Sequence, residues 1–359
     1  MADILLFGAT GYTGRLTAAA LSRTGISFSL CGRDRAKLEA LSAATGGPEV
    51  RVAEVGDVAS LVAALEDCKV LITCVGPFVE LGDTAVEAAL QAKVHYIDST
   101  GEGIFIRRLI DTVDARARAA GIAVAPALGF DEVPGDVAAT LAAEGLDRPA
   151  LDVTYAFPST SSAGTARSAL GIITSPGVWV EAGARREIRA GQIERWAPMP
   201  PPLGPKRALS FPLALAHLAP LHLDVDAFRT YVTSGGVPLT MARIGIPLLR
   251  AVLRSPARPL VDKLLDLQPE GPDDSARASG KWTILAEART VAGAWRNVSV
   301  MGTDVYGLTA ATLARSAVEM ASPGYDRSGV LSPVGALGVE TLRDELARNG
   351  VSIETYEPS

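Results

Sequence analysis

Short apolar, β-prone runs alternate with Ala- and Leu-rich helical stretches over the first 135 residues of this 359-residue chain. The expected strands are 3–7, 27–31, 50–55, 69–75, 94–98 and 122–128. The expected helices between them are 14–23, 34–44, 58–66, 83–92 and 105–119. Strands and helices that alternate with short crossovers form a parallel sheet covered by helices on both faces. The sequence therefore predicts an α/β fold with a doubly wound sheet of the Rossmann type.

The texture of the sequence changes after "GFDEVPGD" (129–136). Strand candidates at 151–158 and 281–290 indicate a second, mixed α/β domain. A long helical pattern begins near residue 304, and Ser332–Pro333 is a typical helix start. We therefore expect the following division of the chain. Residues 1–136 and 304–359 form the first domain, and residues 137–303 form the second.

Composition excludes several classes of function. The net charge of −6 and the lack of a basic stretch with interleaved aromatics argue against nucleic-acid binding. Cys31, Cys68 and Cys74 lie in apolar runs without disulfide or zinc spacing, which is typical of buried thiols in a reducing compartment. The three histidines are far apart, so no metal site is predicted. With no basic leader and no uninterrupted apolar run of about 18–20 residues, we expect a cytoplasmic protein.

The segment "FGATGYTGR" (7–15) places three glycines between the first strand and a helix that begins near Tyr12. Glycine permits a close approach of backbone to pyrophosphate, and a helix N-terminus offers N–H groups and a positive dipole end. The alternative is a turn that uses glycine only to bend, but the alternating strands favour a phosphate cradle. The candidate cofactor-binding residues here are Gly8, Thr10, Gly11, Tyr12, Thr13 and Gly14.

The second strand ends in "CGRDRAKL" (31–38), where an NAD-binding chain carries an acid about 20 residues after the glycines. Arg33 occupies that position, and an arginine can pair with a 2′-phosphate, which favours NADP(H). Asp34 is counter-evidence because it could face a ribose. Lys37 is a further cofactor candidate, or lies on the solvated face of helix 34–44.

Two later strand ends add cofactor candidates. Asp57 can accept a hydrogen bond from an adenine amino group, or it caps helix 58–66. In "CVGPF" (74–78), Gly76, Pro77 and Phe78 would lie near the nicotinamide ribose, or they form only a tight turn.

Taken together, "FGATGYTG", "CGRDRAKL", "VGPF", "HYIDSTGE" and "GFDEVPGD" resemble the saccharopine dehydrogenase-like oxidoreductases, and among them the trans-acting enoyl reductases of lipid and polyketide biosynthesis. The resemblance implies an NADP-type Rossmann domain closed by C-terminal helices. It also implies an inserted α/β domain that covers the active site and often dimerises through its sheet, so we expect a homodimer. The implied reaction is reduction of a C=N or a C=C bond.

Ligands of a doubly wound sheet lie beyond the carboxyl ends of its strands, which directs attention to three acids. Reduction of a polarised double bond requires a hydride on one atom and a proton on its neighbour, and a carboxyl group is a usual proton donor. Asp98 and Glu102 in "HYIDSTGE" and Asp131 in "GFDEVPGD" are the candidates. Each has a structural alternative: a turn cap for Asp98, a bond to loop backbone for Glu102, and a hinge contact for Asp131.

The segment 235–267 is apolar but carries five basic residues against one acid before residue 266. These basic residues are Arg243, Arg250, Arg254, Arg258 and Lys263. Such a segment suits an acyl chain, an anionic carrier protein or a membrane surface, and the alternative is a core-packing helix with a solvated basic side.

The leading hypothesis is an NADPH-dependent reductase of an activated C=C bond in a lipid-like or polyketide-like small molecule, carried on an acyl carrier or CoA. The alternatives are an imine reductase of the saccharopine type and a catalytically silent NADP-binding protein.

Overall fold

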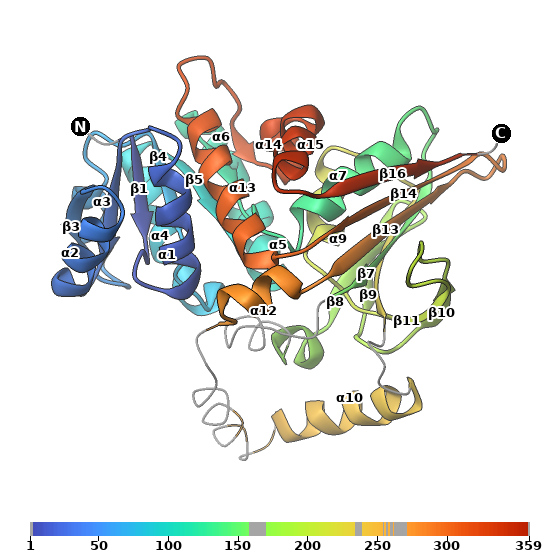
Figure 1. Ribbon diagram of the computed structural model, residues 1–359. Coiled ribbons are helices and arrows are strands. Elements are labelled where there is room, and N and C mark those ends of the chain that lie inside the picture. The colour runs from blue at the N-terminus through green and yellow to red at the C-terminus, as the bar shows by residue number, and fades with distance from the viewer. Residues whose placement is uncertain are drawn as a thin grey trace. The chain divides into compact units, whose positions relative to one another are not determined.

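The computed structural model describes residues 3–157, 170–233, 239–253, 255, 258, 261 and 271–357. The chain forms two compact units (Figure 1). The first comprises Met1–Val133 and Tyr306–Asn349, and the second comprises Pro134–Val305 and Gly350–Ser359.

The first unit is built on a seven-stranded parallel sheet in the order β15-β6-β5-β4-β1-β2-β3. Its strands are β1 (Ile4–Phe7), β2 (Phe28–Gly32), β3 (Glu49–Val52), β4 (Val70–Thr73), β5 (His95–Asp98), β6 (Ala123–Ala125) and β15 (Gly329–Val330). The order of the first six strands is that of two mononucleotide-binding halves joined at β1 and β4. The prediction of a doubly wound α/β sheet is confirmed.

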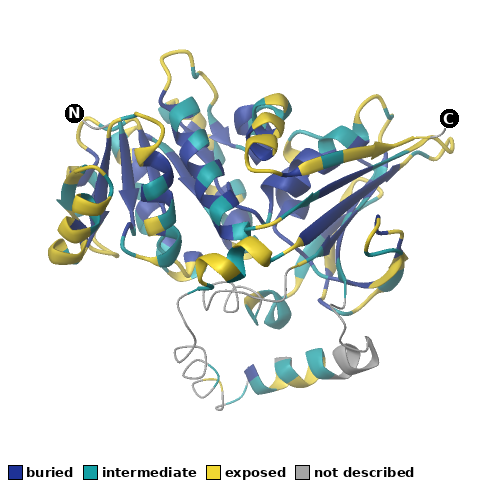
Figure 2. Ribbon diagram, in the orientation of Figure 1, coloured by how far each residue is buried: buried dark blue, intermediate teal, exposed yellow. Residues whose placement is uncertain are grey.

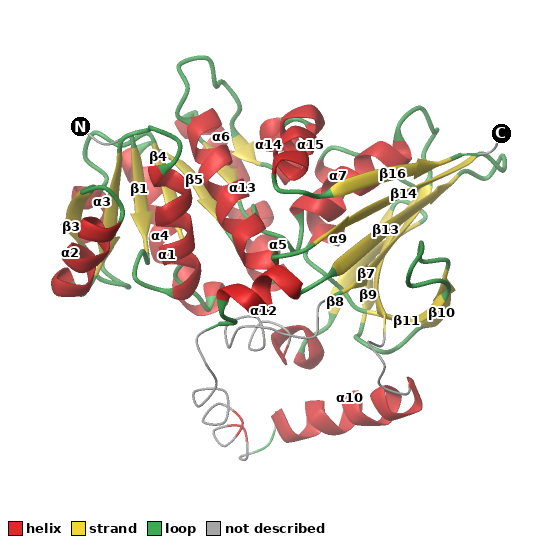
Figure 3. Ribbon diagram, viewed as in Figure 1, coloured by secondary structure: helices red, strands yellow, loops and turns green. Residues whose placement is uncertain are grey.

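Helices flank this sheet, and its strands other than the edge strand β3 are buried along most of their length (Figures 2 and 3). They are α1 (Tyr12–Ser22), α2 (Arg35–Ala44), α3 (Val58–Ala64), α4 (Phe78–Ala92), α5 (Gly103–Thr112), α6 (Asp114–Ala120), α13 (Val305–Met320), α14 (Pro333–Leu337) and α15 (Val339–Arg348). Ser332 caps α14 by accepting a hydrogen bond from the N–H of Gly335, as the Ser–Pro pair predicted.

Several boundaries differ from those expected, and three of them have a clear physical reason. Helix α4 begins at Phe78 rather than 83, since Gly82 inside it fits closely against the ring of Phe105 and does not interrupt the helix. The helix expected at 105–119 is divided at Val113 into α5 and α6. Strand β6 ends at Ala125 rather than 128, because Ala127 adopts a left-handed φ of 63° and turns its N–H toward a side chain.

The second unit contains a nine-stranded mixed sheet in the order β10-β11-β12-β7-β13-β14-β16, with β8 paired to β12 and β9. Its strands are β7 (Ala150–Ala156), β8 (Gly177–Glu181), β9 (Ala184–Ile188), β10 (Glu194–Ala197), β11 (Lys206–Ser210), β12 (Ala227–Thr233), β13 (Trp282–Arg289), β14 (Trp295–Gly302) and β16 (Ser352–Tyr356). The accompanying helices are α7 (Val133–Ala143), α9 (Leu215–Leu218), η1 (Ala219–Leu221), α10 (Leu239–Leu253) and α12 (Asp274–Ser279).

The last ten residues lie in a different unit from the one expected. We placed them with the first domain, whereas β16 pairs antiparallel with β14 in the second sheet, with Ile353 opposite Val300. Gly350, with a φ of 74°, ends the preceding helical segment and redirects the chain. The short strand thereby satisfies the backbone groups along one side of β14.

His95 links β5 to β6 inside the first unit. Its Nδ1 accepts a hydrogen bond from the N–H of Ala123 at 3.0 Å, and its ring meets that of Tyr325 edge-on at 5.0 Å. Burial lowers the pKa of His95 below its ordinary value of 6.5. The imidazole is therefore held neutral, because protonation would remove the acceptor that binds Ala123.

This arrangement predicts a loss of stability on mild acidification. Since the folded pKa of His95 lies below 6.5, the unfolded chain binds the proton more readily, and stability falls as pH drops below that value. We expect the melting temperature to fall more for the native protein than for a His95→Gln variant between about pH 7.5 and about pH 5.5. Equal falls would show that His95 does not contribute to the pH dependence.

Candidate cofactor and active site

The turn between β1 and α1 is fixed to the end of the neighbouring strand β2. The N–H groups of Gly8 and Ala9 both donate to the carbonyl of Cys31, at 3.0 and 3.2 Å. Gly8 has a φ of 80°, and the N–H of Gly11 donates back to its carbonyl at 3.1 Å. The turn is therefore held in shape by the protein alone.

The three glycines differ in what the fold demands of them. A Cβ on Gly14 would lie 2.2 Å from the carbonyl oxygen of Gly8, and one on Gly8 would lie 2.7 Å from Cγ2 of Val75. A Cβ on Gly11 would meet only the oxygen of Gly8, at 3.4 Å, and Gly11 has an ordinary φ of −71°. Packing explains Gly8 and Gly14, whereas at Gly11 the missing side chain leaves the exposed backbone open to a ligand.

The N-terminus of α1 is suited to an anion. Gly11 is its N-cap and provides no side-chain cap, and the first turn contains no acidic residue. Three backbone or ring contacts hold the residues around it. Nη1 of Arg15 donates to the carbonyl of Thr10 at 2.7 Å, Oγ1 of Thr17 donates to that of Thr13 at 2.9 Å, and the ring of Tyr12 meets that of Tyr306 edge-on at 5.2 Å. These features fit a pyrophosphate bound at this end of the helix.

Sequence reasoning missed Arg15 and Tyr306. The signal for Arg15 was its position directly after the third glycine. No sequence signal pointed to Tyr306, because it lies almost 300 residues after the turn and is brought to it by helix α13.

At the end of β2, one cation is left without a partner. Asp34 caps α2 by accepting from the N–H of Lys37 at 3.1 Å, and its carboxylate lies 3.8 Å from Nζ of that lysine. Arg33 is exposed and makes no hydrogen bond or ion pair with any residue that the structure describes. Asp34 and Lys37 thus satisfy each other, while Arg33 is available to a phosphate.

Asp57 and Phe78 have structural roles. Asp57 caps α3 by accepting from the N–H of Ser60 at 3.1 Å, which is the alternative considered for it. Phe78 is buried in the core against Phe105, with ring centroids 5.9 Å apart, so its side chain is not at the strand end as we expected. Gly76 and Pro77, which share a cis peptide bond, are exposed there.

Glu102 holds the N-terminus of α4. Its Oε1 accepts from the N–H of Phe78 at 3.0 Å, and its Oε2 accepts from that of Val79 at 2.8 Å. The negative charge of a carboxylate interacts favourably with the positive end of a helix dipole. Both oxygens are occupied by backbone donors, so the contacts support the structural alternative for Glu102 rather than proton donation.

Asp98 ties two loops at the carboxyl edge of the sheet. It is fully buried and accepts from the Tyr96 hydroxyl at 2.6 Å, the N–H of Thr100 at 2.8 Å and the N–H of Ala127 at 2.9 Å. Burial raises the pKa of Asp98 to about 6, although these donors act in the opposite direction. Asp98 is therefore a positioning residue for the loops after β5 and β6.

Asp131 is the one predicted acid whose carboxylate is not bound by other groups. It makes no hydrogen bond or ion pair with the described residues, and its Oδ2 lies 3.1 Å from the position that a Cβ on Gly101 would take. Burial raises the pKa of Asp131 to about 6.

The loop that carries Asp131 is itself firmly held. The N–H of Phe130 donates to Oγ1 of Thr309 at 3.0 Å, and Oγ1 of Thr312 donates to the carbonyl of Leu128 at 2.8 Å. A fixed backbone thus presents a carboxyl group that has no partner of its own. The hinge contact given as the structural alternative for Asp131 is not formed with any of the described residues.

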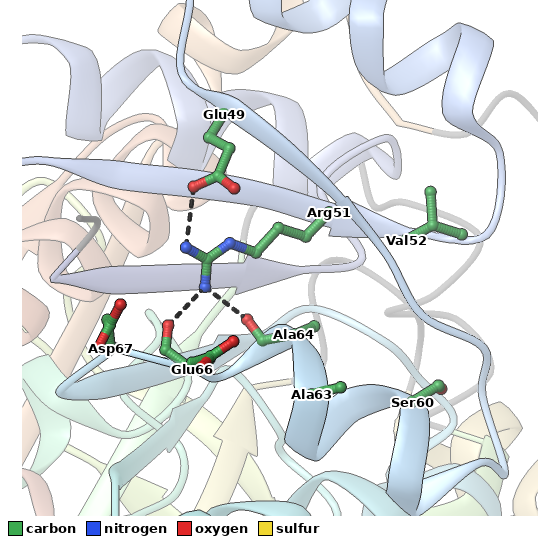
Figure 4. A pocket seen from close by; sticks show the side chains of 8 residues that line it. All are labelled: Glu49, Arg51, Val52, Ser60, Ala63, Ala64, Glu66 and Asp67. Atoms are coloured by element: carbon green, nitrogen blue, oxygen red, sulfur yellow. Dashed lines mark hydrogen bonds and ion pairs between the residues drawn. The ribbon is translucent and has the colours of Figure 1, made fainter.

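A polar pocket lies elsewhere in the first unit, beside β3 and α3 (Figure 4). Arg51 in this pocket donates to the carbonyls of Ala64 and Glu66, at 2.8 and 2.7 Å, and to the carboxylate of Glu49 at 2.8 Å. Its guanidinium therefore caps the C-terminal end of α3. None of the predicted site residues lines this pocket.

Residues 4–124 match the family model of the saccharopine dehydrogenase NADP binding domain. This part of the chain is therefore similar to the NADP-binding domains of that family. The assignment identifies NADP(H) as the cofactor and agrees with the open Gly11 and the unpaired Arg33.

Relatives extend the similarity. A Mycobacterium tuberculosis protein with a provisional name of trans-acting enoyl reductase is 28% identical over an alignment that covers 98% of this chain and 97% of that protein. The "Trans-acting enoyl reductase" of Mycobacterium leprae is 37% identical over 38% of this chain and 34% of its own length. Among solved structures, apo saccharopine dehydrogenase (L-Glu forming) of Saccharomyces cerevisiae matches with a TM-score of 0.65 at 13% identity, covering 100% of both chains, which shows a shared fold.

Two further findings concern metal binding and membrane-spanning helices. Within the described residues, no group of three or more His, Cys, Asp or Glu side chains is placed to hold a metal ion. No helix in this part of the chain is long and apolar enough to cross a membrane.

The different roles of the glycines predict different defects. Gly14→Ala should destabilise the protein by about 2–3 kcal/mol, because α1 must move away from the turn. Gly11→Ala should leave the melting temperature nearly unchanged but weaken NADPH binding by about tenfold or more, since the methyl group occupies the ligand's space. Calorimetry measures the loss of stability, and fluorescence titration measures NADPH binding. If Gly11→Ala bound NADPH as tightly as the native protein, the glycine turn would not be the phosphate-binding site.

Arg33 should distinguish the two nicotinamide cofactors. Loss of a charge-assisted pair predicts that Arg33→Ala weakens NADPH about a hundredfold and NADH less than about threefold. Arg35→Ala is the matched control, because Arg35 is exposed and pairs instead with Glu39 at 3.7 Å. If Arg33→Ala weakened the binding of NADPH and NADH equally, Arg33 would not be the residue that binds the 2′-phosphate.

Proposed function

We propose that the protein is an NADPH-dependent reductase of an activated C=C bond in a lipid-like or polyketide-like enoyl substrate. The family makes the chain an NAD(P)-dependent oxidoreductase. The name of the relative that aligns over 98% of the chain supports the enoyl substrate class.

The first unit contains the residues that would hold the cofactor. The N-terminus of α1 at Gly11 would bind the pyrophosphate, and Arg33 would pair with the 2′-phosphate. Gly76 and Pro77 present exposed backbone at the end of β4, on the nicotinamide side of a doubly wound sheet. When bound, NADPH supplies the hydride for the reduction.

The observation that carries the proposal is the unpartnered carboxyl of Asp131 on its fixed loop. Saturation of an enoyl bond requires a proton on the carbon next to the one that receives the hydride. Asp131 would donate this proton, becoming a carboxylate that regains a proton from solvent. A pKa raised to about 6 keeps part of the group protonated near neutral pH.

Asp98 and Glu102 would serve this step by positioning. Asp98 fixes the loop from which Asp131 projects, through Ala127, and the loop of Gly101, through Thr100. Glu102 joins the latter loop to the start of α4. Both would act without touching the reacting atoms.

Arginines in the second unit favour C=C over C=N reduction. A saccharopine-like substrate carries several carboxylates and requires arginines that are free to bind them. On one face of the second sheet, Arg195 pairs with Asp152 and Glu287, the latter a close ion pair. Arg229 pairs with Glu181 and Asp152, at 2.6 and 3.2 Å, and Arg289 with Glu287 at 3.3 Å.

These acids neutralise the arginines that span this face. Arg185 and Arg186 are exposed on β9, and Arg167 lies outside the described residues. The paired set supports a substrate with few charges, and imine reduction remains the second candidate.

The test is NADPH oxidation with α,β-unsaturated acyl-CoA thioesters in one series and with keto acids plus amines in another. We expect turnover with the thioesters, with kcat falling as pH rises through about 6, since the protonated form of Asp131 is the active one. Asp131→Asn should lower kcat about a hundredfold or more while NADPH affinity is unchanged.

The matched control is Asp67→Asn, at an exposed position with a φ of 64° that asparagine tolerates. Equal activity of the two variants would exclude Asp131 as the proton donor. Turnover only with the amine series would establish C=N reduction, and tight NADPH binding without turnover in either series would indicate a catalytically silent protein.

A further inference from the structure

Helix α10 is unusual because it is apolar around almost its whole circumference. Its sequence, LTMARIGIPLLRAVL, contains two charged residues, Arg243 and Arg250. A helix of this kind is normally buried in a protein core or in lipid. Yet among residues 245–249 and 251–253, whose side chains the structure describes, Leu253 alone is buried, and Leu248 is 64% exposed.

One side of α10 packs on the second unit and another side does not. Cδ1 of Ile246 lies 3.1 Å from the position that a Cβ on Gly191 would occupy, in the turn after β9. Pro247, Leu248 and Ala251 are all exposed, and their spacing places them together on one side of the helix. This side of the helix, defined by Pro247, Leu248 and Ala251, is an apolar face that the described residues leave uncovered.

The length of α10 determines whether it could span a lipid bilayer or only lie on its surface. Its 15 residues extend about 22 Å at 1.5 Å per residue. The hydrocarbon core of a bilayer is about 30 Å thick, so α10 is too short to cross it and is suited to lie along the surface.

The charge of the sequence around α10 distinguishes among the partners that could cover its apolar face. Residues 239–263 carry five basic residues and one acid, whereas the whole chain has a net charge of −6. A second copy would bring the same positive segment against this one, which is unfavourable. An acidic soluble protein would satisfy the charge but would present a polar surface to Leu248. Anionic lipid supplies both the negative headgroups and the apolar layer beneath them.

We propose that α10 binds the surface of an anionic lipid bilayer, with the face of Pro247, Leu248 and Ala251 inserted below the headgroups. The proposal does not depend on the cofactor site or on the reaction that the enzyme catalyses.

The experiment is co-sedimentation of the full chain with vesicles of phosphatidylcholine alone and of phosphatidylcholine and phosphatidylglycerol in equal parts. The native protein should bind the anionic vesicles at least about tenfold more tightly, with the difference lost at high salt. Leu248→Glu should weaken that binding about tenfold or more, because it places a carboxylate in the apolar layer.

Val291→Glu is the matched control, since Val291 is fully exposed in the turn between β13 and β14. It should bind vesicles as the native protein does, and both variants should retain native NADPH affinity, which verifies folding. Failure of the native protein to bind either vesicle, or equal losses in the two variants, would overturn the proposal. Concentration-dependent self-association that Leu248→Glu abolishes, without vesicle binding, would instead assign the face to a second copy.

Discussion

The carboxylate of Asp98 is the contact on which the candidate site depends. Buried at the end of β5, it binds the hydroxyl of Tyr96 and the N–H groups of Thr100 and Ala127. The carbonyl of the same residue accepts from Leu128 at 2.8 Å. One residue thus fixes the two loops that lie at the carboxyl ends of β5 and β6, at the cost of burying an acid whose pKa rises to about 6. These contacts give the carboxylate a structural role, because they fix the backbone of both loops.

The sequence was sufficient for six of the seven strands of the first sheet, because the information that specifies them is local. Each strand is a short apolar run and each crossover is brief, so the periodicity of residues 3–125 specifies the topology. The position of the glycine turn between the first strand and the first helix could also be predicted. The roles of Glu102, Asp98 and Asp131 were not, because all three are acids at strand ends and only tertiary contacts distinguish them. Glu102 meets Phe78 and Val79 across 23 to 24 residues, and the loop of Asp131 is held by α13 across 179 or more.

The second unit was harder to predict for the same reason. Strands β7 and β13 were recognised from their composition, but they pair with each other across more than a hundred residues, and β16 joins the sheet from the end of the chain. Side chains in β7 alternate between two environments. Leu151 and Val153 lie on the apolar face, whereas Asp152 lies opposite Arg229 and Glu287 in a row of charged side chains. Such a row specifies strand register, because a slip of one residue would place its charges among apolar side chains.

The order of the chain through the two units has a consequence for biosynthesis. Residues up to Val133 contain six strands of the first sheet, but β15, Thr309 and Thr312 are made only after Pro134–Val305. Until then, β6 has an open edge and the loop of Asp131 lacks the threonines that hold it. A ribosome-bound chain would thus carry the glycine turn well before Thr309 and Thr312 hold the loop of Asp131, so the turn and the loop would reach their final structure at different stages of synthesis.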